Sequence, residues 1–118
     1  MTVYANIGTL TAGDDYTIDL VIKDEAGEPL NITNLTSAKF YISSQGTLAV
    51  AKDLTDGIEI TSALDGELDI TLAAEDTEGL RGTYEYEVEI VDAEGRYKTP
   101  VYGRVHFRPA LIPNDSGS

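Results

Sequence analysis

Residues 82–95 read Gly-Thr-Tyr-Glu-Tyr-Glu-Val-Glu-Ile-Val-Asp-Ala-Glu-Gly, and this stretch decides the fold class. Apolar and acidic side chains alternate through its middle, in the order Tyr84, Glu85, Tyr86, Glu87, Val88, Glu89, Ile90. Because successive side chains of a strand point to opposite faces, the pattern predicts a strand with a buried face and an acidic face. The turn-forming residues 92–95 and a second alternating run over 97–107 predict an antiparallel hairpin.

Similar short apolar runs recur along the rest of the chain, at 2–10, 16–23, 38–42, 58–60 and 68–72, with an ambiguous one at 48–54. Asp-Gly pairs at 56–57 and 65–66 predict two short hairpin arms. Residues 73–78, closed by Gly79, resemble a helical turn that crosses between sheets. The sequence therefore predicts an all-β fold, an immunoglobulin-like antiparallel β-sandwich of about seven strands with one short helical turn near 73–78. A closed barrel is the alternative.

Two tyrosines of the opening stretch occupy positions with a structural meaning in such sandwiches. Tyr84 stands where a tyrosine corner is expected, with its ring packed and its hydroxyl bonded to upstream backbone. Tyr86 takes the position that a cysteine holds in disulfide-bearing immunoglobulin domains. The alternative is that both are ordinary core aromatics with hydrated hydroxyls.

The composition narrows the possible functions. At 118 residues and 42% hydrophobic content, the chain is expected to form one domain over 1–108, followed by an extended C-terminal arm over 109–118. It carries 21 acidic and 8 basic residues, a net charge of −13, which disfavours nucleic acid and anionic membrane surfaces as partners. It has no cysteine, no recognisable secretory signal and no apolar run long enough to span a bilayer. We therefore expect a soluble protein made in the cytoplasm.

Half of the basic residues lie on or near the final run, and they include Arg104 and Arg108. If the hairpin closes at 92–95, these arginines should lie beside Glu85, Glu87 and Glu89, and opposite charges across strands stabilise a sheet. A mixed-charge face that docks a partner is the alternative interpretation.

Catalytic and metal-binding patterns are weak. His106 is the single histidine, so a zinc-type site would lack further nitrogen or sulfur ligands. The sequence contains no nucleophile elbow and no phosphate-binding loop. Aspartates in predicted turns leave calcium as an alternative, although no EF-hand loop is present. We expect no enzyme activity, no cofactor, no metal and no small-molecule substrate.

The order of turn and strand residues resembles a known family more specifically than any single motif does. The marks are Gly13-Asp14-Asp15, Asp24 with Gly27 and Pro29, Asp56-Gly57-Ile58, Asp65-Gly66, the spacing of Leu72, Asp76, Leu80, Gly82, Tyr84 and Tyr86, Asp92 with Gly95, and the run Val105 to Pro109. Over about residues 10–110, the chain resembles the N-terminal immunoglobulin-like domain of phage baseplate upper proteins and small virion proteins of tailed phages.

The resemblance implies a non-enzymatic structural component of a tailed-phage virion, in the tail, baseplate, neck or capsid surface, made in the host bacterial cytoplasm. Its partners would be other virion proteins and copies of itself. The family's baseplate members continue into a long C-terminal extension, so this chain would correspond to the attachment module.

Four residues near the chain ends are the candidate partner contacts: Tyr4, Leu111, Ile112 and Pro113. The alternative function is a carbohydrate- or cell-surface-binding module, which usually presents exposed aromatic side chains. The candidates for that role are Tyr4, Tyr41, Tyr97 and Tyr102. A binding module of this kind is favoured if three of these four tyrosines line one surface.

Overall fold

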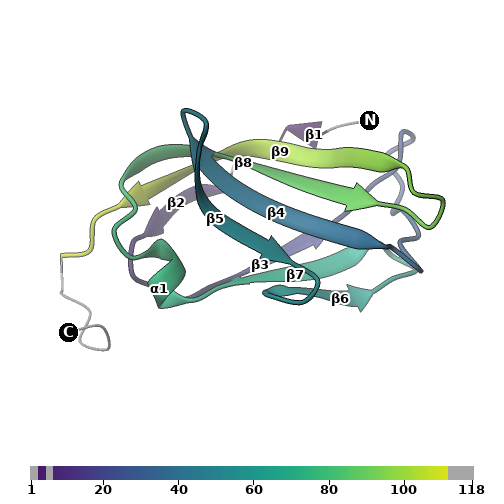
Figure 1. Ribbon diagram of the computed structural model, residues 1–118, viewed down its shortest axis with the longest axis horizontal. Coiled ribbons are helices and arrows are strands. Elements are labelled where there is room, and N and C mark those ends of the chain that lie inside the picture. The colour runs from purple at the N-terminus through teal and green to yellow at the C-terminus, as the bar shows by residue number, and fades with distance from the viewer. Residues whose placement is uncertain (1–2, 5–6, 112–118) are drawn as a thin grey trace.

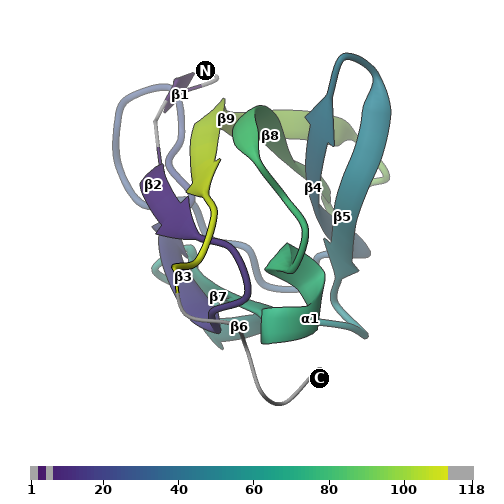
Figure 2. The same cartoon turned by 90° about the vertical axis from the view of Figure 1, so that its left-hand side faces the viewer.

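The computed structural model describes residues 3–4 and 7–111. They form two packed β-sheets and one helical turn, α1 (Ala74–Thr77), which confirms the predicted all-β sandwich (Figure 1). Figure 2 shows the two layers end-on, with β3, β7 and β6 below the larger sheet.

The larger sheet has the strand order β1-β9-β8-β4-β5, with β2 also paired to β9. Its strands are β1 (Val3–Tyr4), β2 (Gly8–Thr11), β4 (Ser37–Ser44), β5 (Thr47–Asp53), β8 (Gly82–Val91) and β9 (Tyr97–Arg108). The smaller sheet has the order β3-β7-β6, formed by β3 (Tyr16–Val21), β7 (Glu67–Leu72) and β6 (Ile58–Ser62).

The chain crosses between the sheets four times, along 12–15, along 22–36, along 54–57 and through α1. This places β3, β7 and β6 in one layer and β4, β8 and β9 in the other, which is the immunoglobulin-like arrangement of two facing sheets. The long hairpin of β8 and β9 forms as predicted, closed by a turn in which Asp92 N–H donates to Arg96 O at 3.0 Å.

Three sequence-based expectations need correction. The described residues form nine strands rather than about seven, because the N-terminal run divides into β1 and β2 and the ambiguous 48–54 segment is a true strand. The pairing is not antiparallel throughout, since β1 and β2 both run parallel to β9. The Asp56-Gly57 unit is not a hairpin arm, because it connects β5 of the larger sheet to β6 of the smaller one.

The core lies between the sheets and draws on both of them. Its largest fully buried side chains are Phe40, Phe107, Ile22, Ile32, Ile42, Leu68, Ile70, Leu72, Ile90, Val88 and Val105, with the polar Thr77. Burying one large apolar side chain contributes about 1.5–3 kcal/mol. The inward half of each alternating run supplies this core, so the opposite half is left on the two outer faces.

The structure gives Tyr84 the contacts predicted for it and buries Tyr86 in the core. The ring of Tyr84 packs edge-on against Phe107, with centroids 5.6 Å apart, and its hydroxyl accepts a hydrogen bond from Arg81 N–H at 3.3 Å. This is the backbone contact expected of a tyrosine corner. Tyr86 is buried and its ring lies 5.6 Å from that of Phe40.

Candidate functional site

The outer face of the larger sheet gathers exposed aromatic and aliphatic side chains. Tyr41 on β4 and Tyr102 on β9 stand on either side of Glu87 on β8, because the three residues are in register across the strands. Tyr41 is 41% exposed, Tyr102 is 43% exposed, and the nearby Leu48 on β5 is 51% exposed. We call the surface formed by Tyr41, Leu48, Glu85, Glu87 and Tyr102 the tyrosine face.

A shallow groove of about 380 Å³ runs over the tyrosine face. Strands in a sheet lie about 4.8 Å apart, so two strand spacings place the backbones of Tyr41 and Tyr102 roughly 10 Å from each other. Two aromatic rings at this spacing with a carboxylate between them can bind a partner by stacking and by hydrogen bonding. The arrangement suits recognition.

The three glutamates of β8 lie opposite different residues on the neighbouring strands. Glu85 lies directly opposite Arg104, as expected. The expectation is wrong for the other two, because the register places Glu87 between Tyr41 and Tyr102 and places Glu89 opposite Lys39 of β4. The expectation for Arg108 is wrong, because it extends past the start of β8. Its guanidinium Nη1 donates to the hydroxyl of Thr11 on β2 at 3.0 Å.

The predicted terminal contacts are described only in part. Tyr4 lies in β1 and its backbone is in register with Tyr102. Leu111 is 87% exposed, while Ile112 and Pro113 fall outside the described residues. Tyr97 is exposed at the other end of β9, beside the 92–95 turn. The surface-exposed Leu48 was not a predicted contact, because an isolated leucine in an ambiguous strand carries no signal of its face.

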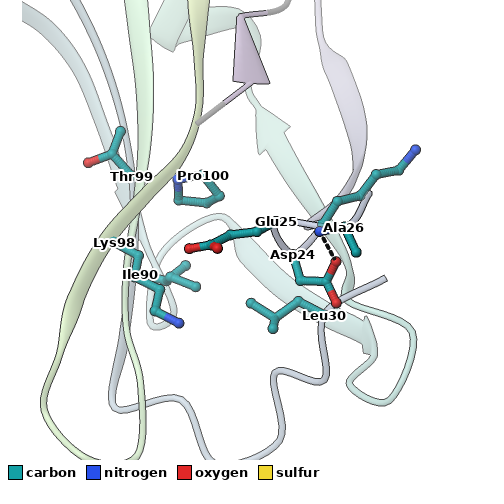
Figure 3. Close-up of a pocket in the computed structure, with 9 residues that line it drawn as sticks. Asp24, Glu25, Ala26, Leu30, Ile90, Lys98, Thr99 and Pro100 are labelled. Atoms are coloured by element: carbon teal, nitrogen blue, oxygen red, sulfur yellow. Dashed lines mark hydrogen bonds between the residues drawn. The ribbon is translucent and has the colours of Figure 1, made fainter. Parts of the chain in front are cut away.

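A second candidate surface lies at the end of the sandwich that carries the turn between β8 and β9. A cavity of about 620 Å³ opens there between the segment after β3 and the start of β9. Leu30, Ile90 and Pro100 give it an apolar lining, and Figure 3 shows the Glu25 carboxylate extending from the loop toward β9. The loop itself is fixed by Asp24, whose Oδ1 accepts the Ala26 N–H at 2.9 Å.

This end cavity was not predicted from the sequence, because its walls come from segments about 70 residues apart. Its charged residues include both lysines and carboxylates, so no single ligand charge is favoured. A neighbouring cavity of about 600 Å³ shares Leu30, Ile90 and Lys98 with it.

The outer face of the smaller sheet is acidic. Asp19 on β3, Asp69 on β7 and Glu59 on β6 are in register, so three carboxylates form one row. The pKa of Asp69 is raised, mainly because its carboxyl group shares a hydrogen bond with Asp19. Partial burial and the negative charges of Asp19 and Glu59 raise this pKa further. Like charges opposite each other destabilise a sheet, so this row costs stability near neutral pH.

Within 3–4 and 7–111, no helix is long and apolar enough to cross a membrane. Across the same residues, no group of three or more histidine, aspartate or glutamate side chains is placed to hold a metal ion.

Comparison with known proteins relates the chain to others through its fold. No protein-family model matches the sequence, and no curated protein matches it either. Among solved structures, the chain is similar to CopC from Methylosinus trichosporium OB3b, with a TM-score of 0.53 and 15% sequence identity. The match covers 89% of this chain and 86% of that one. At this identity the likeness concerns the fold alone.

Proposed function

We propose that this chain is a non-enzymatic structural module that acts through protein–protein contacts, and that it serves as an attachment or decoration component of a tailed-phage virion. The observation that carries the binding role is the tyrosine face. Tyr41, Leu48 and Tyr102 are exposed together on the flat outer side of the larger sheet. Tyrosine is enriched among residues that dominate protein interfaces, since its ring supplies apolar area and its hydroxyl supplies a hydrogen bond.

The virion assignment rests on the sequence resemblance, which extends over about residues 10–110. The resemblance rests on turn residues and on the spacing of strand residues, and several of those turn residues lie in the connections of the sandwich. Gly82 opens β8, while Asp92 and Gly95 close the β8–β9 turn. A rigid sandwich with one aromatic face is a suitable building block for a symmetric assembly.

The assignment can be tested on purified particles of a phage that encodes this chain. We expect mass spectrometry to detect the chain at a fixed copy number per particle and electron microscopy to place its density against another virion protein. A chain that is expressed during infection but absent from purified particles would disprove the virion role.

The tyrosine face can be tested separately in the same particles. Tyr102→Ala removes the exposed ring on the β9 side of the face, so we expect incorporation to fall at least tenfold. His106→Ala is the matched control, because His106 is also exposed on β9 but lies four residues further along. Equal incorporation of both variants would show that the contact lies elsewhere.

A carbohydrate- or cell-surface-binding module is the second candidate. Among the described side chains, two of the four candidate tyrosines, Tyr41 and Tyr102, share a surface, one fewer than the three that would favour this function. The support that remains is this pair, because aromatic rings stack on sugar faces. Glycan-array binding that is lost in both Tyr41→Ala and Tyr102→Ala would favour this function over attachment. Glycan binding that is retained in both variants would show that the tyrosine face does not bind the glycan.

A further inference from the structure

Strand β5 forms one margin of the larger sheet. It has β4 on one side and, among the described residues, no strand on the other (Figure 2). Its seven residues, Thr47–Asp53, make it the longest marginal strand of the sandwich. A marginal strand presents a row of backbone N–H and C=O groups that can pair with another strand.

The other margins carry features that discourage such pairing. β3 and β6, the margins of the smaller sheet, present the carboxylates Asp19 and Glu59 on their exposed face. At the far side of the larger sheet, β1 and β2 are two and four residues long. Short strands and charged side chains are the usual protection of sheet edges.

Strand β5 has less of this protection, namely one register shift against β4, which leaves Ala49 as an extra residue between Leu48 and Val50. Its residues 47–51 are uncharged, and Leu48, Ala49 and Ala51 are exposed. The positive charge of Lys52 is turned inward, where its Nζ lies 2.8 Å from Asp76 Oδ2. Because this lysine is already neutralised by α1, it does not repel a strand that approaches the edge.

The distribution of charge indicates which partner fits. The chain carries a net charge of −13, so two copies repel each other over most of their surfaces. Residues 29–52, however, contain no aspartate or glutamate and include Lys39 and Lys52. All of the β4–β5 hairpin except its last residue, Asp53, lies within this stretch, so it is the region where two copies can approach with the least repulsion.

We propose that two copies of this chain pair antiparallel through β5, so that their larger sheets join into one continuous sheet across a two-fold axis. In a pair centred at Val50, Asp53 of one copy lies opposite Thr47 of the other, which keeps the two aspartates at opposite ends of the ladder. The two Ala51 residues become diagonal neighbours on the same face, at roughly 7–8 Å. This self-pairing does not depend on the proposed virion role.

Analytical ultracentrifugation of the full chain tests the pairing. We expect the average mass to rise with concentration from 12.7 kDa toward twice that value. We also expect dimerisation to strengthen with added salt, because salt screens the repulsion between the acidic copies. A wild-type chain that stays monomeric at every concentration and salt level would overturn the proposal.

Three variants locate the interface. Ala51→Glu and Ala51→Lys each place like charges across the two-fold axis, so each is expected to weaken dimerisation at least tenfold, whereas an equimolar mixture of the two should recover it. Thr61→Glu, on an exposed position of β6, is the matched control and should dimerise like the wild type. Circular dichroism confirms that each variant is folded.

Two outcomes would contradict the β5 interface even if a dimer forms. One is an unchanged dimer in the Ala51 variants, and the other is a dimer that Thr61→Glu disrupts equally. Hydrogen exchange gives a measurement that needs no variant, since β5 amides should gain protection as concentration rises. Tyr102 lies three strands away from the edge, so Tyr102→Ala tests the tyrosine face without altering β5.

Discussion

The outer faces of the two sheets follow the same alternating pattern, yet they bring different side chains together. On the larger sheet, Glu85 lies opposite Arg104. On the smaller sheet, Asp69 lies between Asp19 and Glu59. Alternation decides which side of a strand a residue faces, whereas the register of neighbouring strands decides whether its charge is stabilised. The larger sheet therefore offers a neutralised surface suited to contacts, and the smaller sheet offers an acidic one.

The two sheets also differ in how closely their hairpin turns are packed, and the largest expected effect lies there. Gly66, between β6 and β7, has φ +69°, and a Cβ built on it would lie 2.6 Å from Ile22 O and 2.7 Å from Leu30 O. Gly46, between β4 and β5, has φ +82° and open space around it. Gly66→Ala should therefore cost about 3 kcal/mol or more of folding free energy, since backbone strain and a backbone clash add.

Gly46→Ala is the control for Gly66→Ala and should cost only about 1 kcal/mol, because a positive φ is unfavourable for alanine but no atom lies near the added methyl group. Urea unfolding monitored by circular dichroism measures both. Equal losses for the two variants would mean that the β6–β7 turn is not held against the crossing segment.

The second largest expected effect on stability concerns the ion pair between β5 and α1. Lys52 on β5 binds Asp76 of α1, and their side chains are 10% and 23% exposed. Burial acts to raise the pKa of Asp76, but the hydrogen bonds from Lys52 and from Ala73 N–H outweigh it and hold the pKa below its usual value. Lys52→Met leaves this carboxylate unpaired and should cost about 2–3 kcal/mol, less than a fully buried pair because Asp76 keeps some solvent.

The double variant Lys52→Met/Asp76→Asn removes both charges and should be more stable than Lys52→Met alone. The Asp76 pKa also predicts a pH dependence. Its contribution to stability is present above the unfolded value of about 3.9 and is lost as pH falls through the lower folded value. Acid unfolding that is identical in Lys52→Met and the wild type would contradict this assignment.

A smaller effect distinguishes two glutamates of the same strand. Glu85→Lys places a positive charge opposite Arg104 and should cost roughly 0.5–1 kcal/mol. Glu87→Lys should cost less, because Glu87 lies between Tyr41 and Tyr102 rather than opposite a cation. The exchange Glu85→Lys/Arg104→Glu should restore most of the loss in a double-mutant cycle. No recovery would mean that the pair contributes nothing.

The smallest effect is a gain in stability on the acidic face. Asp69→Asn removes the central carboxylate of the row, so the urea midpoint should rise slightly at pH 7. The folded pKa of Asp69 is raised, so the destabilisation is present above that pKa and fades as pH falls through it toward the unfolded value of about 3.9. The advantage of the variant should therefore shrink between neutral pH and pH 4. Glu67→Gln on the same strand is a control with a smaller expected gain.

Much of the fold could be predicted from local patterns. The strict alternation of 84–90 required a strand with Tyr86, Val88 and Ile90 inward, and all three are buried. The helical turn after β7 followed from its composition and from Gly79. By contrast, the parallel pairing of the N-terminal strands with β9 could not be predicted, because nothing in 2–10 specifies a partner almost 100 residues away.

The candidate site was only partly predictable for the same reason. The sequence identified Tyr41 and Tyr102 as outward-facing aromatics, but they become neighbours of Glu87 only through the register of three strands. Arg108 carried the same local signal as Arg104, yet it extends beyond β8 and binds Thr11 instead. A side chain's face is a local property, whereas its neighbour depends on where the partner strand ends.

Taken alone, the amino-acid order determined most of the strands, their inward halves and the acidic character of the chain, because these depend on residues close together in sequence. The tertiary structure decided which strand lies at the margin, which glutamate meets an arginine and where exposed tyrosines gather. Those properties depend on strand order and register, which are set by packing one sheet against the other across the shared core.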